Sequence, residues 1–317
     1  MEGLEREIYR RYIDEMKSFL RKTLNEPPQE VSIYQLMKKY DAFCFDGFGT
    51  LYNRGDFVYP GALEMFQTLR EKGKQIRIVS NAASDVDCML AADAVRRGFV
   101  LNSSEFISSG SLLPEMVEEL RLVYGPGGSR LRLNEVYYIG RESGKRLLET
   151  CGIVAVAADG YPREPVVAVS SAVETPKTYK RAVEILRESG SILLVMNPDA
   201  YAPGIDGTRE PVSGALCERL RRDSACWLNH NEGCTTFYLG KPFPDIWYRL
   251  KSSLKPTYSG KTPRAIMIGD TLGTDILGAR IAGMDCALLV GRNQPAEELL
   301  EDQEYLGVAP DYYLTFD

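Results

Sequence analysis

Ala42-Phe43-Cys44-Phe45 leads directly into Asp46-Gly47-Phe48-Gly49-Thr50-Leu51. The four apolar residues predict a buried strand, and the glycines at positions 47 and 49 predict a tight turn after it. Open α/β sheets bind their ligands at the carboxyl ends of the strands, so the first polar residue after this strand is well placed for chemistry. Asp46 is therefore the candidate nucleophile.

The segments around this strand alternate between strand and helix patterns. Short apolar runs at 42–45, 76–79 and 106–108 are separated by helical patterns at 61–71 and 85–97. This alternation predicts an α/β fold with a doubly wound, Rossmann-like parallel sheet. The same pattern resumes late in the chain, with a strand at 237–239, a helix at 244–250, a strand at 265–268 and a final strand at 286–290.

A second set of strand-like runs interrupts this pattern and predicts an inserted α/β domain. The runs lie at 136–139, 166–169 and 192–196, with a helical run at 178–188. Glycine-rich or polar breaks at 125–129 and 229–233 are the candidate hinges on its two sides. The expected organisation is an N-terminal helical extension at 1–40, a core domain at 41–124 and 236–317, and an inserted domain at 125–235.

The N-terminal extension carries one apolar stripe. Apolar residues recur there at three- and four-residue spacing, which is typical of an amphipathic helix. They are Leu4, Ile8, Tyr12, Met16, Phe19 and Leu20. The stripe must be covered, either by the core of the same chain or by a second copy in a homodimer.

Composition excludes several classes of partner. The 317 residues include 44 acidic and 38 basic ones, a net charge of −6, without a long basic block that could follow a nucleic acid backbone. The N-terminus lacks an apolar signal segment, and no apolar run is long enough to span a membrane. We therefore expect no nucleic acid, no membrane and a cytoplasmic location, with the seven scattered cysteines as reduced thiols.

Three further polar sites follow predicted strands. Ser80 and Asn81 can donate hydrogen bonds to an anion. Lys241 precedes a helix that begins near Pro244, where an ammonium and a helix N-terminus both favour an anion. Two carboxylates lie around a strand-to-helix turn and suit a hard cation such as Mg²⁺; they are Asp270 and Asp275.

The order and spacing of these sites resemble the four motifs of the haloacid dehalogenase (HAD) superfamily, with Asp46 in motif one, Ser80 in motif two, Lys241 in motif three and the Asp270/Asp275 pair in motif four. Ser80 follows Asp46 by 34 residues, whereas Lys241 follows Ser80 by 161. Only the second gap can hold a cap domain. This arrangement is similar to class IIA, which includes nucleotide, sugar, phosphoglycolate and pyridoxal phosphatases.

The resemblance implies a metal-dependent phosphoryl transfer. Asp46 would attack the phosphorus and become an aspartyl-phosphate, while Ser80 and Lys241 hold the phosphoryl oxygens. Mg²⁺ would be held by Asp46, the main-chain carbonyl of Phe48, Asp270 and Asp275. The expected substrate is a small phosphorylated metabolite.

Position 48 departs from the family pattern. Most HAD phosphatases have a second aspartate there, which protonates the leaving group and then activates water, whereas Phe48 cannot transfer a proton. Three interpretations follow: a phosphatase or phosphotransferase with another acid or an easy leaving group, a weak or inactive metabolite-binding and regulatory homologue, or a dehalogenase-like hydrolase of carbon–halogen bonds. The third is disfavoured because dehalogenases lack the paired metal carboxylates.

The inserted domain could supply substrate contacts and a replacement acid. Asn197 and Asp199 lie in an Asn-Pro-Asp turn, and Asp206 and Glu210 lie in the segment 201–211 that corresponds to the specificity loop of the class. With Asn81, we therefore predict substrate-binding roles for Asn197, Asp199 and Glu210. His230, the single histidine, is expected to be structural.

Overall fold

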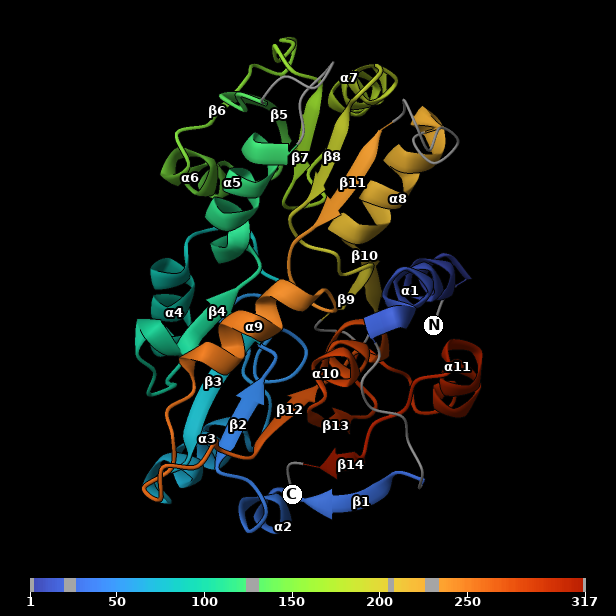
Figure 1. Ribbon diagram of the computed structural model, residues 1–317. Coiled ribbons are helices and arrows are strands. Elements are labelled where there is room, and N and C mark those ends of the chain that lie inside the picture. The colour runs from blue at the N-terminus through green and yellow to red at the C-terminus, as the bar shows by residue number, and fades with distance from the viewer. Residues whose placement is uncertain (1–2, 20–26, 124–130, 205–207, 226–233, 316–317) are drawn as a thin grey trace.

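The computed structural model describes residues 3–19, 27–123, 131–204, 208–225 and 234–315, and it contains two parallel sheets, one above the other in Figure 1. The seven-stranded sheet has the order β1-β14-β13-β12-β2-β3-β4, and the five-stranded sheet has the order β11-β8-β7-β5-β6. Neighbouring strands within each sheet are parallel. The predicted fold class, an α/β core with an added α/β unit and an N-terminal helix, is confirmed.

The strands of the larger sheet are β1 (Gln29–Ser32), β2 (Ala42–Phe45), β3 (Gln75–Ser80), β4 (Phe106–Ser108), β12 (Ala265–Gly269), β13 (Asp285–Leu289) and β14 (Tyr312–Thr315). Those of the smaller sheet are β5 (Glu135–Ile139), β6 (Val154–Ala155), β7 (Val166–Val169), β8 (Ile192–Val195) and β11 (Thr235–Tyr238). An antiparallel hairpin of β9 (Tyr201–Pro203) and β10 (Arg209–Pro211) lies between the sheets in Figure 1.

The helices are α1 (Gly3–Met16), α2 (Ile33–Met37), α3 (Ala62–Glu71), α4 (Asp87–Arg96), α5 (Leu113–Val123), α6 (Lys145–Thr150), α7 (Pro176–Leu186), α8 (Ser213–Ser224), α9 (Pro244–Ser253), α10 (Leu277–Ala282) and α11 (Leu299–Leu306). Five short turns complete the described elements: η1 (Lys17–Phe19), η2 (Ser103–Glu105), η3 (Gly110–Leu112), η5 (Glu142–Gly144) and the π-helical η6 (Leu272–Ile276).

Alternation along the core strands explains why this sheet is covered on both faces. Phe43 and Phe45 pack in one apolar cluster with Phe66 of α3, whereas Cys44 between them belongs to a second cluster with Trp247 of α9. All four side chains of β2 are fully buried. Successive side chains of a strand point to opposite faces, so β2 is buried on both sides, as in a doubly wound sheet.

Sheet pairing corrects the prediction at several strands. Thr235–Tyr238 pairs with β8 in the smaller sheet, although the 237–239 run was expected in the core. The strand at 286–290 was expected to be the last, but β14 follows it and pairs with it. β1, from the N-terminal extension, pairs with β14 at the sheet edge. Helix α5 lies beside the smaller sheet and contacts α6. The boundaries 1–40, 41–124 with 236–317, and 125–235 thus stay a prediction.

The N-terminal helix is confirmed as α1, with Ile8 and Tyr12 buried as predicted. It contacts α8, α11 and η6 of the same chain, so the part of the stripe that α1 carries packs on this chain itself. Phe19 of the predicted stripe is 44% exposed, and Leu20 lies outside the described residues. A homodimer stays an untested alternative.

Some predictions fall on other parts of the chain. The candidate hinges at 125–129 and 229–233, together with Asp206 and His230, lie outside the described residues. Cys234 is disulfide-bonded, which contradicts the expectation that every cysteine is a reduced thiol. Among the described helices, none combines the length and the apolar character that a membrane crossing needs.

Candidate active site

The carboxyl edge of the core sheet brings the predicted site residues together. β2 lies between β3 and β12, and Phe45 is in register with Ile78 on one side and Ile268 on the other. The backbone N–H of Asp46 donates to the carbonyl of Ile268 at 2.9 Å, which extends the ladder by one residue. Asp46, Ser80 and Asp270 consequently emerge from three adjacent strands at one edge, where the strand order reverses.

Lys241 connects two of the carboxylates. Its Nζ donates to Asp46 Oδ1 and to Asp275 Oδ1, each at 2.7 Å, and its side chain is only 1% exposed. Burial alone would lower the pKa of Lys241, but the carboxylates of Asp275 and Asp46 outweigh it and raise the pKa above its usual value. The lysine is therefore a fixed cation between the two carboxylates.

Burial acts on the aspartates in the opposite sense. It raises the pKa of Asp46 well above its usual value, against the attraction of Lys241. Burial also raises the pKa of Asp270 to about 7, and the nearby Asp275 carboxylate adds to this effect. Both shifts reflect carboxylates held together away from water, an arrangement that a bound cation would stabilise.

Asp270 and Asp275 have different hydrogen-bond partners and therefore different structural roles. Asp275 Oδ2 accepts from the backbone N–H groups of Asp270 and Thr271, both at 3.1 Å, while its Oδ1 faces Lys241. Asp275 thus holds the turn and the lysine. Asp270 Oδ1 accepts from the hydroxyl of Thr50 at 3.1 Å, and Gly49 approaches so closely that a Cβ there would lie 2.0 Å from Asp270 Oδ2.

The donor set fits a hard divalent cation. Asp46, Asp270 and Asp275 are buried, and each offers an oxygen within 4.8 Å of the others. Three carboxylates beside one ammonium leave two uncompensated negative charges when all are ionised, which a single Mg²⁺ would balance. Oxygen-only ligation is the coordination that Mg²⁺ prefers. The arrangement can therefore hold a metal.

Ser80 ends β3, and the next residue, Asn81, lies beside Lys241. Ser80 is buried and its hydroxyl accepts from the backbone N–H of Ala82 at 3.2 Å. Asn81 Oδ1 accepts a hydrogen bond from the backbone N–H of Lys241 at 2.7 Å, and Asn81 Nδ2 donates one to the carbonyl of Lys241 at 2.9 Å. This double contact fixes the lysine backbone relative to β3.

Asp199 comes from the segment after β8 and reaches the same place. Its Oδ1 accepts from Asn81 Nδ2 at 2.8 Å. Burial raises the pKa of Asp199 to about 6, although Lys241 and the hydrogen bond from Asn81 oppose the shift. Asn197 is one step further away: its side chain accepts from the backbone N–H of Asp199 at 2.9 Å and so shapes the turn.

Glu210 does not join this cluster. Its exposed carboxylate, on β10, forms an ion pair with Arg54 of the core loop after motif one. The hairpin lies on the core through Asn53 as well, whose Nδ2 donates to the carbonyl of Pro203 at 3.0 Å. The predicted specificity segment thus touches the core loops, but Glu210 is engaged with Arg54.

Phe48 lies at the rim of the site. Its side chain is 37% exposed and meets Tyr52 edge-on, with ring centroids 5.1 Å apart. The aromatic ring brings no proton donor to this position.

Sequence reasoning missed three residues around Asp270. Asn293 donates its backbone N–H to Asp270 Oδ2 at 3.3 Å and its side-chain amide to the hydroxyl of Thr271 at 2.7 Å. Arg292 donates to the carbonyl of Gly49 at 3.0 Å. Thr50, which the sequence analysis named without predicting a role, donates its hydroxyl to Asp270. Arg292 and Asn293 follow the carboxyl end of β13, and that position was the available signal.

Comparisons with known proteins agree with this geometry. A family model described as haloacid dehalogenase-like hydrolase matches residues 43–154, and a HAD-hydrolase-like model matches residues 238–315. The chain is 29% identical to mouse (Mus musculus) chronophin over 279 residues, covering 85% of this chain and 88% of the relative. It is 25% identical to ribonucleotide monophosphatase NagD of Escherichia coli over 233 residues, 73% and 80% of the two chains.

Solved structures share the fold. A HAD superfamily structure from Cytophaga hutchinsonii superposes with a TM-score of 0.72 at 22% identity, covering 91% of this chain and 98% of that one. The p-nitrophenyl phosphatase of Archaeoglobus fulgidus gives a TM-score of 0.64 at 20% identity, covering 86% and 95%. These likenesses extend over both sheets.

Proposed function

Because the chain belongs to the HAD-like hydrolases of the phosphatase type, in the class IIA branch, we propose that it is a Mg²⁺-dependent phosphatase or phosphotransferase that acts on a small phosphorylated metabolite through Asp46. The observation that carries the proposal is the placement of Lys241 between Asp46 and Asp275, beside a third carboxylate on Asp270.

The residues would divide the work as follows. An oxygen of Asp46 attacks phosphorus, the bond from phosphorus to the leaving oxygen breaks, and an aspartyl-phosphate forms. Lys241 and Ser80 bind the phosphoryl oxygens as charge develops on them. Asp46, Asp270, the carbonyl of Phe48 and Asp275 would hold a divalent cation, which would supply the positive charge that an anionic substrate needs to approach a carboxylate. Water then attacks phosphorus, the bond from phosphorus to the Asp46 oxygen breaks, and orthophosphate leaves with the Asp46 carboxylate regenerated.

Phe48 makes proton transfer the slow part of this scheme. The departing oxygen must take its proton from solvent or from the cap, and the attacking water lacks the usual base. We therefore expect turnover to be slow and to favour substrates whose leaving oxygen needs no protonation. The names of two similar proteins support a small phosphate ester as substrate: NagD is a ribonucleotide monophosphatase, and the Archaeoglobus fulgidus protein is a p-nitrophenyl phosphatase.

A panel of phosphate esters assayed with and without Mg²⁺ tests the proposal. Wild type should hydrolyse at least one ester slowly and only with the metal, and Asp46→Asn should abolish that activity. Activity that persists unchanged in Asp46→Asn would remove Asp46 as the nucleophile.

The second candidate is a metabolite-binding or regulatory role without turnover, and the observation that favours it is the proton-inert ring of Phe48 at the rim. It predicts tight, Mg²⁺-dependent binding of a phosphorylated metabolite with no hydrolysis. A dehalogenase role is disfavoured by the three clustered carboxylates, and halide release from a 2-haloacid without metal would overturn both leading candidates.

A further inference from the structure

Helix α1 lies between the two sheets and touches elements that belong to each (Figure 1). On the core side it contacts α11 and η6, the turn that carries Asp275. On the cap side it contacts α8. A surface helix that only covered a core would have no need to contact both units.

On the core side, α1 contacts η6, the turn that carries the Asp275 carboxylate, through Tyr9. The ring of Tyr9 lies against Gly273, where a Cβ would come within 2.0 Å of Tyr9 Cγ. Gly273 is two residues before Asp275, whose carboxylate binds Lys241. The close packing of a fully buried ring on this glycine restricts where the turn can lie.

The cap contact reaches the turn that carries Asp199. The hydroxyl of Tyr12 donates a hydrogen bond to the carbonyl of Pro198 at 2.9 Å. The hydroxyl of Tyr9 accepts a hydrogen bond from the N–H of Ala200 at 3.4 Å. Asp199 is therefore flanked by two anchored residues. Its carboxylate accepts from Asn81 Nδ2 of the core at 2.8 Å, so this turn and the core meet directly as well.

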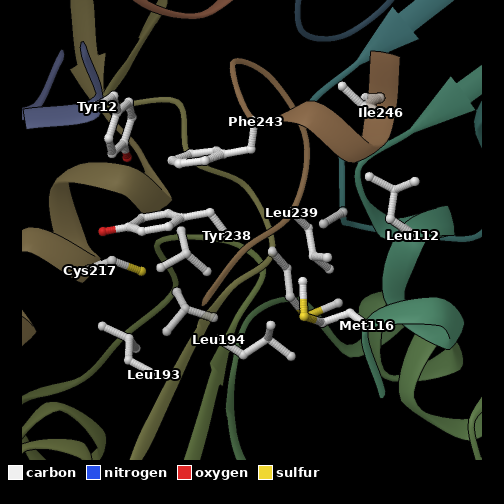
Figure 2. Close-up of a cluster of buried hydrophobic side chains, with 14 of the residues drawn as sticks. Tyr12, Leu112, Met116, Leu193, Leu194, Cys217, Tyr238, Leu239, Phe243 and Ile246 are labelled. Atoms are coloured by element: carbon white, nitrogen blue, oxygen red, sulfur yellow. The ribbon is translucent and has the colours of Figure 1, made fainter. Parts of the chain in front are cut away.

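Aromatic packing and an ion pair fix the helix in place. Figure 2 shows the ring of Tyr12 next to the stacked rings of Tyr238 and Phe243, with centroids 5.4 and 5.2 Å away. The Tyr238 and Phe243 rings are stacked at 4.4 Å, on the two sides of the motif that contains Lys241. Near the start of α1, buried Glu5 pairs with Arg209 of β10.

Two series of residue contacts thus connect α1 with Lys241. One passes from Tyr9 through the 271–275 turn to the carboxylate that holds the Lys241 ammonium. The other passes from Tyr12 through the 197–200 turn and Asn81 to the Lys241 backbone. We propose that α1 is a positioning element of the active site, in which Tyr9 and Tyr12 hold these two turns in one arrangement and thereby fix Lys241 between its carboxylates. The catalytic consequence rests on the proposed phosphatase function, whereas the mechanical coupling does not.

The test uses the full chain with Tyr12→Phe, which deletes one hydrogen bond and keeps the ring, and Tyr9→Phe as a second conservative variant. Asp14→Asn is the matched control, because Asp14 is on the same helix but exposed, and its ion pair within the described part of the chain is with Arg10 at 3.6 Å. Amide hydrogen exchange is followed at 197–203 and 271–277, and kcat and KM are measured with a hydrolysed ester.

Loss of one hydrogen bond to Pro198 or Ala200 should speed exchange at 197–203 by about two- to tenfold. The rise at 271–277 should be smaller, because both variants keep the Tyr9 ring on Gly273, and Asp14→Asn and β2 should not change. The kcat should fall by a similar factor with KM nearly constant. Wild-type exchange in both segments of Tyr12→Phe and Tyr9→Phe, or a uniform rise over the whole chain, would overturn the proposal. Faster exchange in a protein that hydrolyses nothing would support the coupling and count against the phosphatase function alone.

Discussion

Restoring a carboxylate at position 48 is the sharpest perturbation of the proposed chemistry. The change is Phe48→Asp. The side chain is 37% exposed and its ring contact is with Tyr52, so the substitution removes little core. Loss of that aromatic pair and of partial burial should lower the free energy of unfolding by about 1–2 kcal/mol, within what a folded domain tolerates.

The new carboxylate would stand beside an acidic site. Asp46, Asp270 and Asp275 already cluster there, and nearby like charges raise the pKa of an added carboxyl group, which suits a general acid. General acid–base catalysis contributes about 10² to 10⁴ in rate. We therefore expect kcat to rise by about that factor on an alkyl phosphate, whose leaving oxygen needs a proton.

The assay compares an alkyl phosphate with 4-nitrophenyl phosphate in wild type, Phe48→Asp and Phe48→Asn. The asparagine has nearly the same shape as the aspartate but transfers no proton, so it separates chemistry from the removal of the ring. Mg²⁺ titration by calorimetry verifies that each variant keeps the site. If Phe48→Asp binds metal and is no faster than Phe48→Asn on either ester, the missing acid is not what limits this protein.

Three further perturbations address the charged cluster. Lys241→Met leaves the buried carboxylates of Asp46 and Asp275 without their cation, so metal-free denaturation should show a loss of about 3–5 kcal/mol together with loss of activity; unchanged stability would contradict the ion-pair account. Because the Asp270 carboxyl has its pKa raised to about 7 and must be ionised to bind metal, calorimetric Mg²⁺ affinity should fall by about tenfold per pH unit below 7 and level off above it; affinity independent of pH would exclude Asp270 as a ligand. Gly49→Ala places a Cβ 2.0 Å from Asp270 Oδ2 at a backbone φ of +83°, and calorimetry should then find Mg²⁺ binding weakened by at least about tenfold, whereas wild-type affinity would show that the loop adapts.

The strand ends were predictable from sequence because each is a short apolar run with a polar residue directly after it. Asp46 and Asp270 directly follow β2 and β12, and Ser80 is the last residue of β3. Parallel strands place such residues at one edge without further information. The spacing from Ser80 to Lys241 predicted the inserted unit for a similar reason. These inferences depend only on local pattern and chain order.

Contacts between distant segments were not predictable in the same way. The partner of Glu210 is Arg54, and the partner of Tyr12 is a backbone carbonyl at Pro198; neither pairing leaves a local pattern. The run at 237–239 looks like a core strand because burial gives the same apolar pattern in either sheet, and only its pairing with β8 assigns it. The short edge strand β1 lacks an apolar run, which is why it was read as part of the extension.

Asp46 is the residue proposed to accept the phosphoryl group. Rapid mixing of the protein with Mg²⁺ and 4-nitrophenyl phosphate, acid quenching and peptide mass spectrometry tests this directly. Nitrophenolate leaves unaided while Phe48 cannot activate water, so we expect a burst of nitrophenol and a phosphoryl group on the peptide that contains Asp46, both absent in Asp46→Asn. Hydrolysis without any adduct on that peptide, or an adduct that persists in Asp46→Asn, would contradict it.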